Sequence, residues 1–388
     1  MPIRSAVKDL VPDVQTWRRE IHQNPGLMYE VEATAEFVAN RLRAFGCDEV
    51  KTSIGRTGVV GVIHGAKGSS SRAIGLRADM DALPIEEETN LPYRSKIPGK
   101  MHACGHDGHT AMLLGAARRL AQTRDFAGNA VVIFQPAEEG GAGAMAMIDD
   151  GLMDKFGIEE VYGMHNMPAL PVGSFKIRKG PTMASADEIT IIVEGRGGHG
   201  AMPHQCIDPV VIGAQIVTAL QTIASRNVDP LDSVVVSVTR FEAGTANNII
   251  PQSAWLNGTV RTLKAATRDA VEKRIHEIAA GVAAAGGATA RVEYRRGYPP
   301  TVNHGPQTDF AAAVARKVAG ESHVDPNAPP VMGAEDFSFM LEARPGAFIF
   351  IGNGDSAMLH HPAYDFNDAA LPYGMSYWVE LVETALAP

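Results

Sequence analysis

Short apolar runs of strand length alternate with segments of helical periodicity in the first part of this 388-residue chain. Residues 58–64 (GVVGVIH), 73–79 (AIGLRAD) and 130–135 (AVVIFQ) are rich in apolar and β-branched side chains, as strands are. Residues 32–45 and 110–123 instead carry apolar side chains at helical spacing. This alternation predicts an α/β fold in which helices flank a mixed, largely parallel sheet.

Ionisable side chains follow several of these strands where they end. Asp79 ends one strand, Glu138 and Glu139 come shortly after another, and His165 follows an apolar run at 159–164. Ligands of parallel sheets gather outside the carboxyl ends of the strands. The sequence therefore predicts a functional site at this edge of the sheet.

The most unusual stretch is 101–109 (MHACGHDGH), which follows a long Pro-containing loop from residue 82. Only Gly105 separates Cys104 from His106, so both side chains can reach one cation with little crowding. Thiolate and imidazole together suit zinc, cobalt, nickel or a similar first-row ion. The alternative is that the two side chains are simply packed in a loop. A helix with Thr110 as its N-cap is expected to follow.

A centre of two metal ions needs about four or five protein ligands. The chain offers a set of that size: Cys104, His106, Glu139, His165 and His360. Adjacent side chains after a strand point in different directions, so one carboxylate of the Glu138–Glu139 pair can bind metal while the other faces a water molecule. Two surface glutamates are the alternative, but an apolar strand leads into the pair and a Gly-rich turn leads out.

The pattern of the chain changes between residues 184 and 295. Strand, helix, strand, strand, helix and strand follow one another there, which is the order of the ferredoxin-like split arrangement. We expect this smaller β-α-β-β-α-β domain, 184–295, to be inserted into a metal-binding domain formed by 1–183 and 296–388.

Composition narrows the class of partner. A net charge of −9 argues against nucleic acid or an anionic membrane, because both need a basic protein face. Three scattered cysteines form no disulfide framework and favour a cytoplasmic location. No stretch approaches the roughly 20 apolar residues of a membrane span. These properties predict a small-molecule substrate.

Nine blocks of sequence resemble one known family in the same order. They are RADMDALPIEEET, HACGHDGHT, FQPAEEGGAGA, GMHNMPALPVG, GGHGAMPH, GTANNIIP, GTVRT, GAEDFSFM and LHHPAYDFND, and the N-terminal WRREIHQNP is similar too. The family is that of hippurate hydrolase and the plant auxin–amino acid conjugate hydrolases, a branch of the zinc aminoacylase and dimetal carboxypeptidase superfamily.

The resemblance implies a metal-dependent amidohydrolase that cleaves N-acyl or N-aroyl amino acids. Its metal ligands, for two divalent ions such as zinc, manganese, cobalt or nickel, match the five residues Cys104, His106, Glu139, His165 and His360. Glu138 matches the general base that takes a proton from the metal-activated water. A homodimer or homotetramer formed through the inserted lid domain is also implied.

The resemblance implies further roles outside the ligand set. His199 matches a lid histidine that polarises the scissile carbonyl and can come from a partner subunit. Asn248 and Arg261 match lid positions suited to a substrate carboxylate, for which the guanidinium fork of Arg is apt. Asp79 stands where the wider superfamily has a histidine ligand, so we expect Asp79 and Asp81 to orient ligands through hydrogen bonds.

Alternatives stay open for activity and for several histidines. N-acetyl-diaminopimelate deacetylation belongs to the same chemistry. A cysteine hydrolase with Cys104 as nucleophile and a non-catalytic metal-binding module are the rivals from other classes. His102 and His109 are expected to form hydrogen bonds near the site, with ligation as the alternative, and His22 is expected to have an ordinary surface or core role.

Overall fold

The structure, a computed structural model, describes residues 5–388, which form two compact units. Unit 1 runs to Thr182 and includes Val302–Pro329 and Asp336–Pro388; unit 2 comprises Met183–Thr301 and Pro330–Glu335. The predicted insertion, 184–295, is shorter than unit 2, because residues 296–301 and 330–335 also contact the inserted segment.

Unit 1 contains an eight-stranded mixed sheet of order β1-β2-β4-β3-β5-β16-β6-β15. The strands are β1 Glu49–Ile54, β2 Gly58–His64, β3 Ala73–Asp79, β4 Asn129–Gln135, β5 Ile158–Pro168, β6 Phe175–Lys176, β15 Val324–Asp325 and β16 Gly346–Gly354. The four central strands β4, β3, β5 and β16 are parallel, whereas β1 and β2 pair antiparallel at one side. The predicted α/β fold with a mixed, largely parallel sheet is confirmed.

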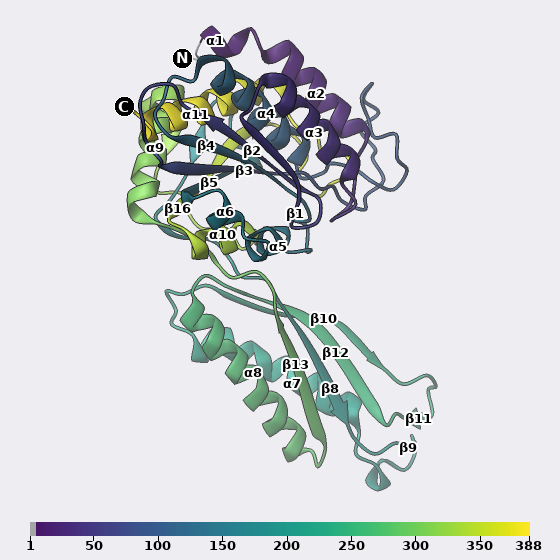
Figure 1. Ribbon diagram of the computed structural model, residues 1–388. Helices are drawn as coiled ribbons and strands as arrows, with labels where there is room; N and C mark the ends of the chain where they lie inside the picture. The colour runs from purple at the N-terminus through teal and green to yellow at the C-terminus, as the bar shows by residue number, and fades with distance from the viewer. Residues whose placement is uncertain (1–4) are drawn as a thin grey trace. The chain divides into compact units, whose positions relative to one another are not determined.

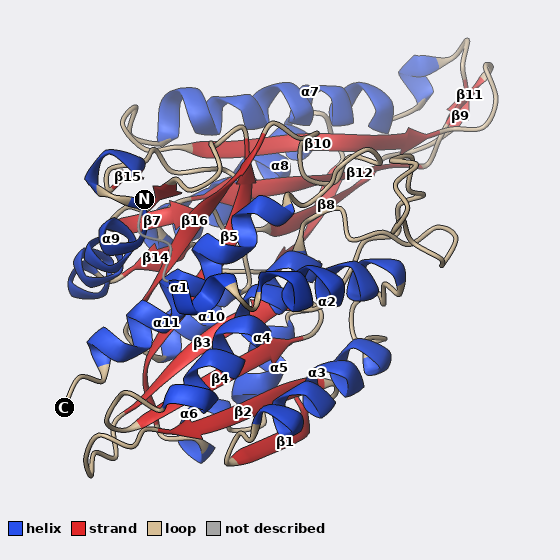
Figure 2. Ribbon diagram, turned by 90° about the horizontal axis from the view of Figure 1, so that it is seen from above, coloured by secondary structure: helices blue, strands red, loops and turns tan. Residues whose placement is uncertain are grey.

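Helices cover both faces of this sheet (Figure 1). They are α1 Ser5–Lys8, α2 Val11–Gln23, α3 Glu32–Phe45, α4 His106–Thr123, α5 Gly143–Asp149, α6 Leu152–Lys155, α9 Gly305–Ala319, α10 Phe337–Ala343 and α11 Leu371–Ala385. Figure 2 shows α2, α3 and α4 in blue over the red strands β2, β3 and β4. Helices α5, α6 and α10 lie on the opposite face.

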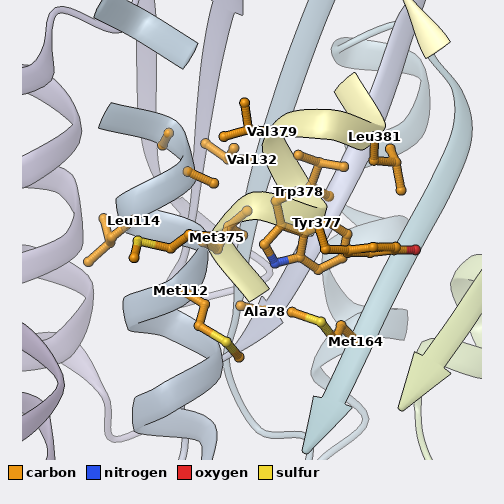
Figure 3. Close-up of a cluster of buried hydrophobic side chains, with 14 of the residues drawn as sticks. Ala78, Met112, Leu114, Val132, Met164, Met375, Tyr377, Trp378, Val379 and Leu381 are labelled. Atoms are coloured by element: carbon orange, nitrogen blue, oxygen red, sulfur yellow. The ribbon is translucent and has the colours of Figure 1, made fainter. Parts of the chain in front are cut away.

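The core of unit 1 lies between α4, α11 and the sheet (Figure 3). Ala78 of β3, Val132 of β4, Met112 and Leu114 of α4 and Trp378 of α11 are all buried there. Close packing of this kind holds α4 against the face of the sheet. The first turn of α4 is therefore held in a fixed position near the carboxyl end of β3.

Helix α4 begins at His106, four residues before the predicted start at Thr110. Gly105 precedes it with φ +88°, and a Cβ there would lie 2.3 Å from Asn166 Nδ2 and 2.5 Å from the Tyr364 hydroxyl. The prediction of a loop as far as residue 109 was wrong, because a helix start fixed by tertiary contacts leaves no periodic signal. His106 and His109 consequently lie in the first turn of a helix.

Unit 2 is a four-stranded antiparallel sheet of order β10-β12-β8-β13 with two long helices. Its elements are β8 Asp187–Glu194, β9 Gly198–His199, α7 Pro209–Thr222, β10 Val234–Ala243, β11 Ile249–Ile250, β12 Ser253–Thr262, α8 Ala265–Ala285 and β13 Thr289–Arg296. Helices α7 and α8 pack against each other and against the sheet. The predicted β-α-β-β-α-β order is confirmed.

Two further strands, β7 Gly180–Met183 and β14 Thr301–Asn303, pair where the chain passes between the units. Among residues 5–388, no helix combines the length and the apolar character that crossing a membrane requires.

Candidate metal centre

The chain segment Cys104–His106 is held in place by side chains from two other parts of unit 1. Asn166 Nδ2 donates to the Cys104 carbonyl at 2.6 Å, and the Tyr364 hydroxyl donates to Asn166 Oδ1 at 2.8 Å. These contacts occupy the space that a Cβ of residue 105 would need, so only glycine fits there. Cys104 and His106 thus leave the backbone on either side of a glycine in the left-handed region.

Hydrogen bonds at Nδ1 leave the Nε2 atoms of His106 and His165 directed at the site. His106 Nδ1 lies 2.8 Å from the Asp81 carbonyl and His165 Nδ1 lies 2.6 Å from the Asn166 carbonyl, so each Nδ1 carries the proton that it donates. His106 Nε2 is buried and has no hydrogen-bond partner among the described residues. His165 Nε2 lies 3.3 Å from Cys104 Sγ. This tautomer is the one that a metal-binding histidine needs.

The donor atoms fall into groups that share members. The atoms of Cys104, His106 and His165 lie within 4.8 Å of one another, as do those of Cys104, Glu139 and His360. Cys104 belongs to both groups, and His106 joins Glu138 and Glu139 in a third. All five predicted ligands therefore meet in unit 1, with the thiol at the centre and the Glu138 carboxylate beside them.

Glu139 and His360 form the more open side of the cluster. His360 Nε2 lies 3.3 Å from Glu139 Oε1, and the His360 side chain is 52% exposed, whereas Cys104, His106 and His165 are buried. His360 has φ +65° and its backbone N–H donates to the Ala103 carbonyl at 2.8 Å. A strained left-handed backbone at a non-glycine residue is typical of functional sites.

Asp81 holds three parts of the centre at once. Its Oδ1 accepts from the Glu138 backbone N–H and its Oδ2 from the Glu139 N–H, both at 3.0 Å, while its own carbonyl accepts from His106. Because both carboxylate oxygens are used, the turn that carries the two glutamates has a fixed direction. The geometry fits the orienting role expected of Asp81.

Asp79 is fully buried beside His106 and His109. It accepts from His109 Nδ1 and from Arg77 Nη1, both at 2.7 Å, and its Oδ2 lies 3.7 Å from His106 Nε2. Burial opposes the charge, but His106, Arg77 and His109 outweigh it and hold the pKa of Asp79 well below its usual range. An ionised carboxylate therefore lies close behind the ligand positions.

The carboxylates around His106 and Cys104 favour the binding of a cation. Burial opposes protonation of His106, yet Asp79, Asp81 and Glu139 raise its pKa to about 10. Burial and then the carboxylates Glu139, Glu138 and Asp79 raise the pKa of the Cys104 thiol well above its usual range. A field that holds protons on ligands this strongly also attracts divalent cations, which displace those protons on binding. The donor set and its charge both fit a metal site.

The same field disfavours the cysteine-hydrolase alternative. A nucleophilic cysteine needs a thiolate, which a neighbouring imidazolium stabilises. The closest ring is that of His165, whose pKa burial and then His109 lower well below the usual value, so it is neutral. His106 in the same donor group is charged, but burial and then the carboxylates still keep the pKa of the Cys104 thiol well above its usual range. The Cys104 thiol can donate to His165 Nε2, but that ring supplies no positive charge.

The three predicted lid residues lie in unit 2. His199 in β9 pairs with Ile249 in β11, and the Gly200 N–H donates to the Asn248 carbonyl at 2.8 Å, so His199 and Asn248 are close together. Arg261 lies near the other end of β12, where it pairs with Val235. The structure therefore brings His199 and Asn248 together beside β9 and β11 and leaves Arg261 near the far end of β12. Figure 1 shows β9 and β11 at one end of the sheet.

Asn166 was not predicted from the sequence to take part in the site. Its side chain donates to the Cys104 carbonyl, and its backbone N–H donates to His109 Nε2 at 2.9 Å. Its position beside His165 was the only signal for it. Asp336 lies in the GAEDFSFM block, whose Glu335–Asp336 pair is expected to line or support the pocket, and it accepts from the Ala144 N–H at 2.9 Å and from Gln135 Nε2 at 2.8 Å.

Comparison with known proteins identifies the family. Residues 75–384 match the peptidase family M20/M25/M40. The chain belongs to this family. It is 46% identical to a hippurate hydrolase of Campylobacter jejuni over 375 residues, which cover 97% of each chain. It is 38% identical to the IAA-amino acid hydrolase ILR1-like 4 of Arabidopsis thaliana, with coverage of 92% of this chain and 82% of the relative.

A solved structure with the same fold is that of the YxeP protein of Bacillus subtilis, described as a dinuclear metal-binding peptidase of family M20. It superposes with a TM-score of 0.86 at 35% identity and covers 98% of this chain and 99% of its own. The predictions of the family and of a metal-dependent amidohydrolase are confirmed. These relatives favour an enzyme over a non-catalytic binding module.

Proposed function

We propose that this M20 enzyme hydrolyses the amide bond of N-acyl or N-aroyl amino acids, with benzoylglycine (hippurate) as a representative substrate. The observation that carries the proposal is that Cys104 belongs to two donor groups at once, with Glu138 beside them. Extensive similarity to a hippurate hydrolase supports this class of substrate. Deacetylation of N-acetyl-diaminopimelate is the alternative within the same chemistry.

Two divalent ions would be held by Cys104, His106, Glu139, His165 and His360. Membership of Cys104 in both groups supports a role for its thiolate as a ligand. Thiolate and imidazole ligands suit zinc, cobalt and nickel, and the carboxylate leaves manganese open. When bound, such ions polarise an amide carbonyl and make a water molecule acidic enough to react at neutral pH.

Glu138 is the residue that moves the proton. Asp81 directs its backbone, and its carboxylate lies within 4.8 Å of the ligand atoms of His106 and Glu139. Glu138 takes a proton from the attacking water as the C–O bond forms, and gives it to the amine nitrogen as the C–N bond breaks. Glu139 cannot share this task while it serves as a ligand. The products are a carboxylic acid and a free amino acid.

His199 would donate a hydrogen bond to the carbonyl oxygen as negative charge develops there, and Asn248 and Arg261 would hold the substrate carboxylate. Residues Ser253 to Arg261 of β12 separate Asn248 from Arg261 by about 25 Å at roughly 3.3 Å per residue. That span exceeds an N-acyl amino acid. Contributions from both residues to one substrate therefore require a second subunit.

A homodimer or homotetramer formed through unit 2 would satisfy this requirement. Edge strand β10 exposes Phe241 and helix α7 exposes Val211, which are 40% and 53% accessible. Apolar side chains on an edge strand and an adjacent helix support association at this surface. The cytoplasmic location stays a prediction from the cysteine content.

The test is hydrolysis of an N-acyl amino acid panel by protein freed of metal and then supplied with zinc, manganese, cobalt or nickel. We expect no turnover without metal, and release of benzoate and glycine from benzoylglycine after metal is added. The Glu138→Gln variant is the matched control, because it should bind metal without turnover. Turnover that persists in a chelator, or that is confined to N-acetyl-diaminopimelate, would refute the proposal.

A further inference from the structure

Helix α2 buries two basic side chains on the face that packs into unit 1. Arg18 and His22 lie one turn apart, and both side chains are 0% exposed. Charged groups are almost never fully buried unless they are paired. The WRREIHQNP segment that carries them is so far without a role in the proposed reaction.

His22 bridges two buried carboxylates that flank the Cys104–His106 segment. His22 Nδ1 lies 2.8 Å from Asp107 Oδ2, and His22 Nε2 lies 3.3 Å from Glu87. The Glu87 side chain is 3% exposed and Asp107 is fully buried. Burial opposes the charge on His22, but Asp107 and Glu87 raise its pKa to about 9, so both ring nitrogens donate at neutral pH.

The two carboxylates lie before and after Cys104 along the chain. Between β3 and α4, residues 80–105 form no helix and only isolated bridges, and this stretch delivers Cys104. Glu87 lies early in it, where it also accepts the Ser95 N–H at 2.7 Å. Asp107 follows His106 directly in the first turn of α4. An imidazolium between them holds both the early part of this stretch and the first turn of α4 against α2.

Arg18 also contacts Asp107, the carboxylate that His22 binds. Its Nη1 lies 3.6 Å from Asp107 Oδ2, and its Nε donates to Asp368 Oδ1 at 2.8 Å. Arg18 also lies over the ring of Tyr93, 4.5 Å from its centroid, within the same 80–105 stretch. Apolar residues often replace a buried ionic cluster without loss of stability, so we infer that this cluster serves to fix the relative positions of the groups it joins.

We propose that His22 is a positioning residue for the metal centre: its hydrogen bonds to Glu87 and Asp107 hold Cys104 and His106 at the spacing that metal binding needs. His22 contacts neither ligand and acts through the two carboxylates. The inference rests on the proposed metal centre and adds a determinant that lies outside the ligand set and its immediate hydrogen-bond partners Asp79 and Asp81.

The test is titration of metal-free full-length protein with Co²⁺, which gives a thiolate-to-cobalt charge-transfer band when a cysteine binds. We expect His22→Gln to bind Co²⁺ about 10–100-fold more weakly, with an altered band, as is usual when a residue that orients ligands is lost. Arg19→Gln is the matched control. Arg19 lies on the same helix, contacts Asp368 and Tyr93 and is 41% exposed, but it does not reach Asp107, so its Co²⁺ affinity should equal that of wild type.

The outcomes separate this proposal from the one on which it rests. A wild-type protein without the charge-transfer band would refute ligation by Cys104, and both proposals with it. An intact wild-type band together with an unchanged affinity and spectrum in His22→Gln, whatever its thermal stability, would refute the role of His22 alone. If His22→Gln does not fold, Glu87→Gln replaces it. That variant keeps the Asp107 contact, and it should weaken Co²⁺ binding in the same direction; unchanged binding would overturn the proposal.

Discussion

Ionisation of His22 should give this protein a specific dependence of stability on pH. Its pKa rises from an ordinary 6.5 to about 9 in the folded protein, because Asp107 and Glu87 outweigh the burial that opposes its charge. The unfolded chain has no such partners. A rise of this size corresponds to about 3 kcal/mol of stabilisation, at 1.36 kcal/mol for each tenfold change in the proton affinity.

The sign follows from the raised pKa. Below about pH 6.5, His22 is protonated in both folded and unfolded protein, and its full contribution is present. As the pH rises to about 9, the unfolded protein releases this proton first and the contribution is lost. The free energy of unfolding of wild type, relative to His22→Gln, should therefore shrink by about 3 kcal/mol between about pH 6 and pH 9.5.

Urea unfolding of the metal-free protein at a series of pH values measures this difference. Trp17 and Trp378 are buried in unit 1, so tryptophan fluorescence in a Trp255→Phe background, which removes the tryptophan of unit 2, reports unit 1. Burial raises the pKa of the Cys47 thiol to about 12, so ionisation of unfolded cysteines also lowers stability at high pH. That effect is the same in both proteins and cancels.

Parallel stability curves would refute the reasoning. They would mean that His22 is neutral in the folded protein, and that its contacts with Asp107 and Glu87 are not those of an imidazolium. A constant difference between wild type and His22→Gln would then measure packing and neutral hydrogen bonds alone.

Four further predictions concern the centre and the lid. Glu138→Gln should keep its metal and lose about 10²–10⁴-fold in kcat; loss of the metal would make Glu138 a ligand. Cys104→Ser should weaken metal binding without unfolding the chain. Thiol reagents should inactivate metal-free wild type faster than metal-loaded wild type, because a bound metal protects a ligating thiol; equal rates would exclude ligation by Cys104. Asp79→Asn should destabilise the protein by about 3–5 kcal/mol in urea unfolding, because the buried Arg77 loses a charged partner; a change below about 1 kcal/mol would contradict that pairing. His199→Ala should lower kcat by about 10²–10³ at constant metal content. Mixing it with Glu138→Gln should restore activity if His199 acts across subunits, and no recovery in exchanging subunits would place its action within one chain.

The edge of the sheet where the centre lies could be predicted because it depends on strand order alone. Asp79 ends β3, and the Glu138–Glu139 turn follows β4, the parallel neighbour of β3. His165 lies near the end of β5, on the other side of β3. Apolar runs locate such strands, and parallel pairing aligns their carboxyl ends. His360 follows no such rule, because it lies in an irregular segment, and only the resemblance of its motif indicated its position.

Two local errors have physical causes. Strand β1 was not predicted, because Glu49–Ile54 is mostly exposed at the edge of the sheet and shows no apolar alternation. The start of α4 was placed four residues late, because Gly105 reads as a loop residue. What decides the conformation there is the contact of Gly105 with Asn166 and Tyr364, about 60 and 260 residues away along the chain. Local pattern carries no information on contacts of that range.

The role of His22 could not be predicted from the helical period. At about 100° per residue, the apolar stripe Leu10, Val14, Trp17 and Ile21 covers about 60° of α2, and Arg18 and His22 lie about 40° and 80° beyond its edge. Both side chains are nevertheless buried, because other parts of unit 1 cover that flank of α2 as well. Burial of two basic groups needs carboxylate partners. The partner that both contact is Asp107 in the first turn of α4, directly after His106, so only the tertiary packing of α2 on α4 connects His22 with the metal centre.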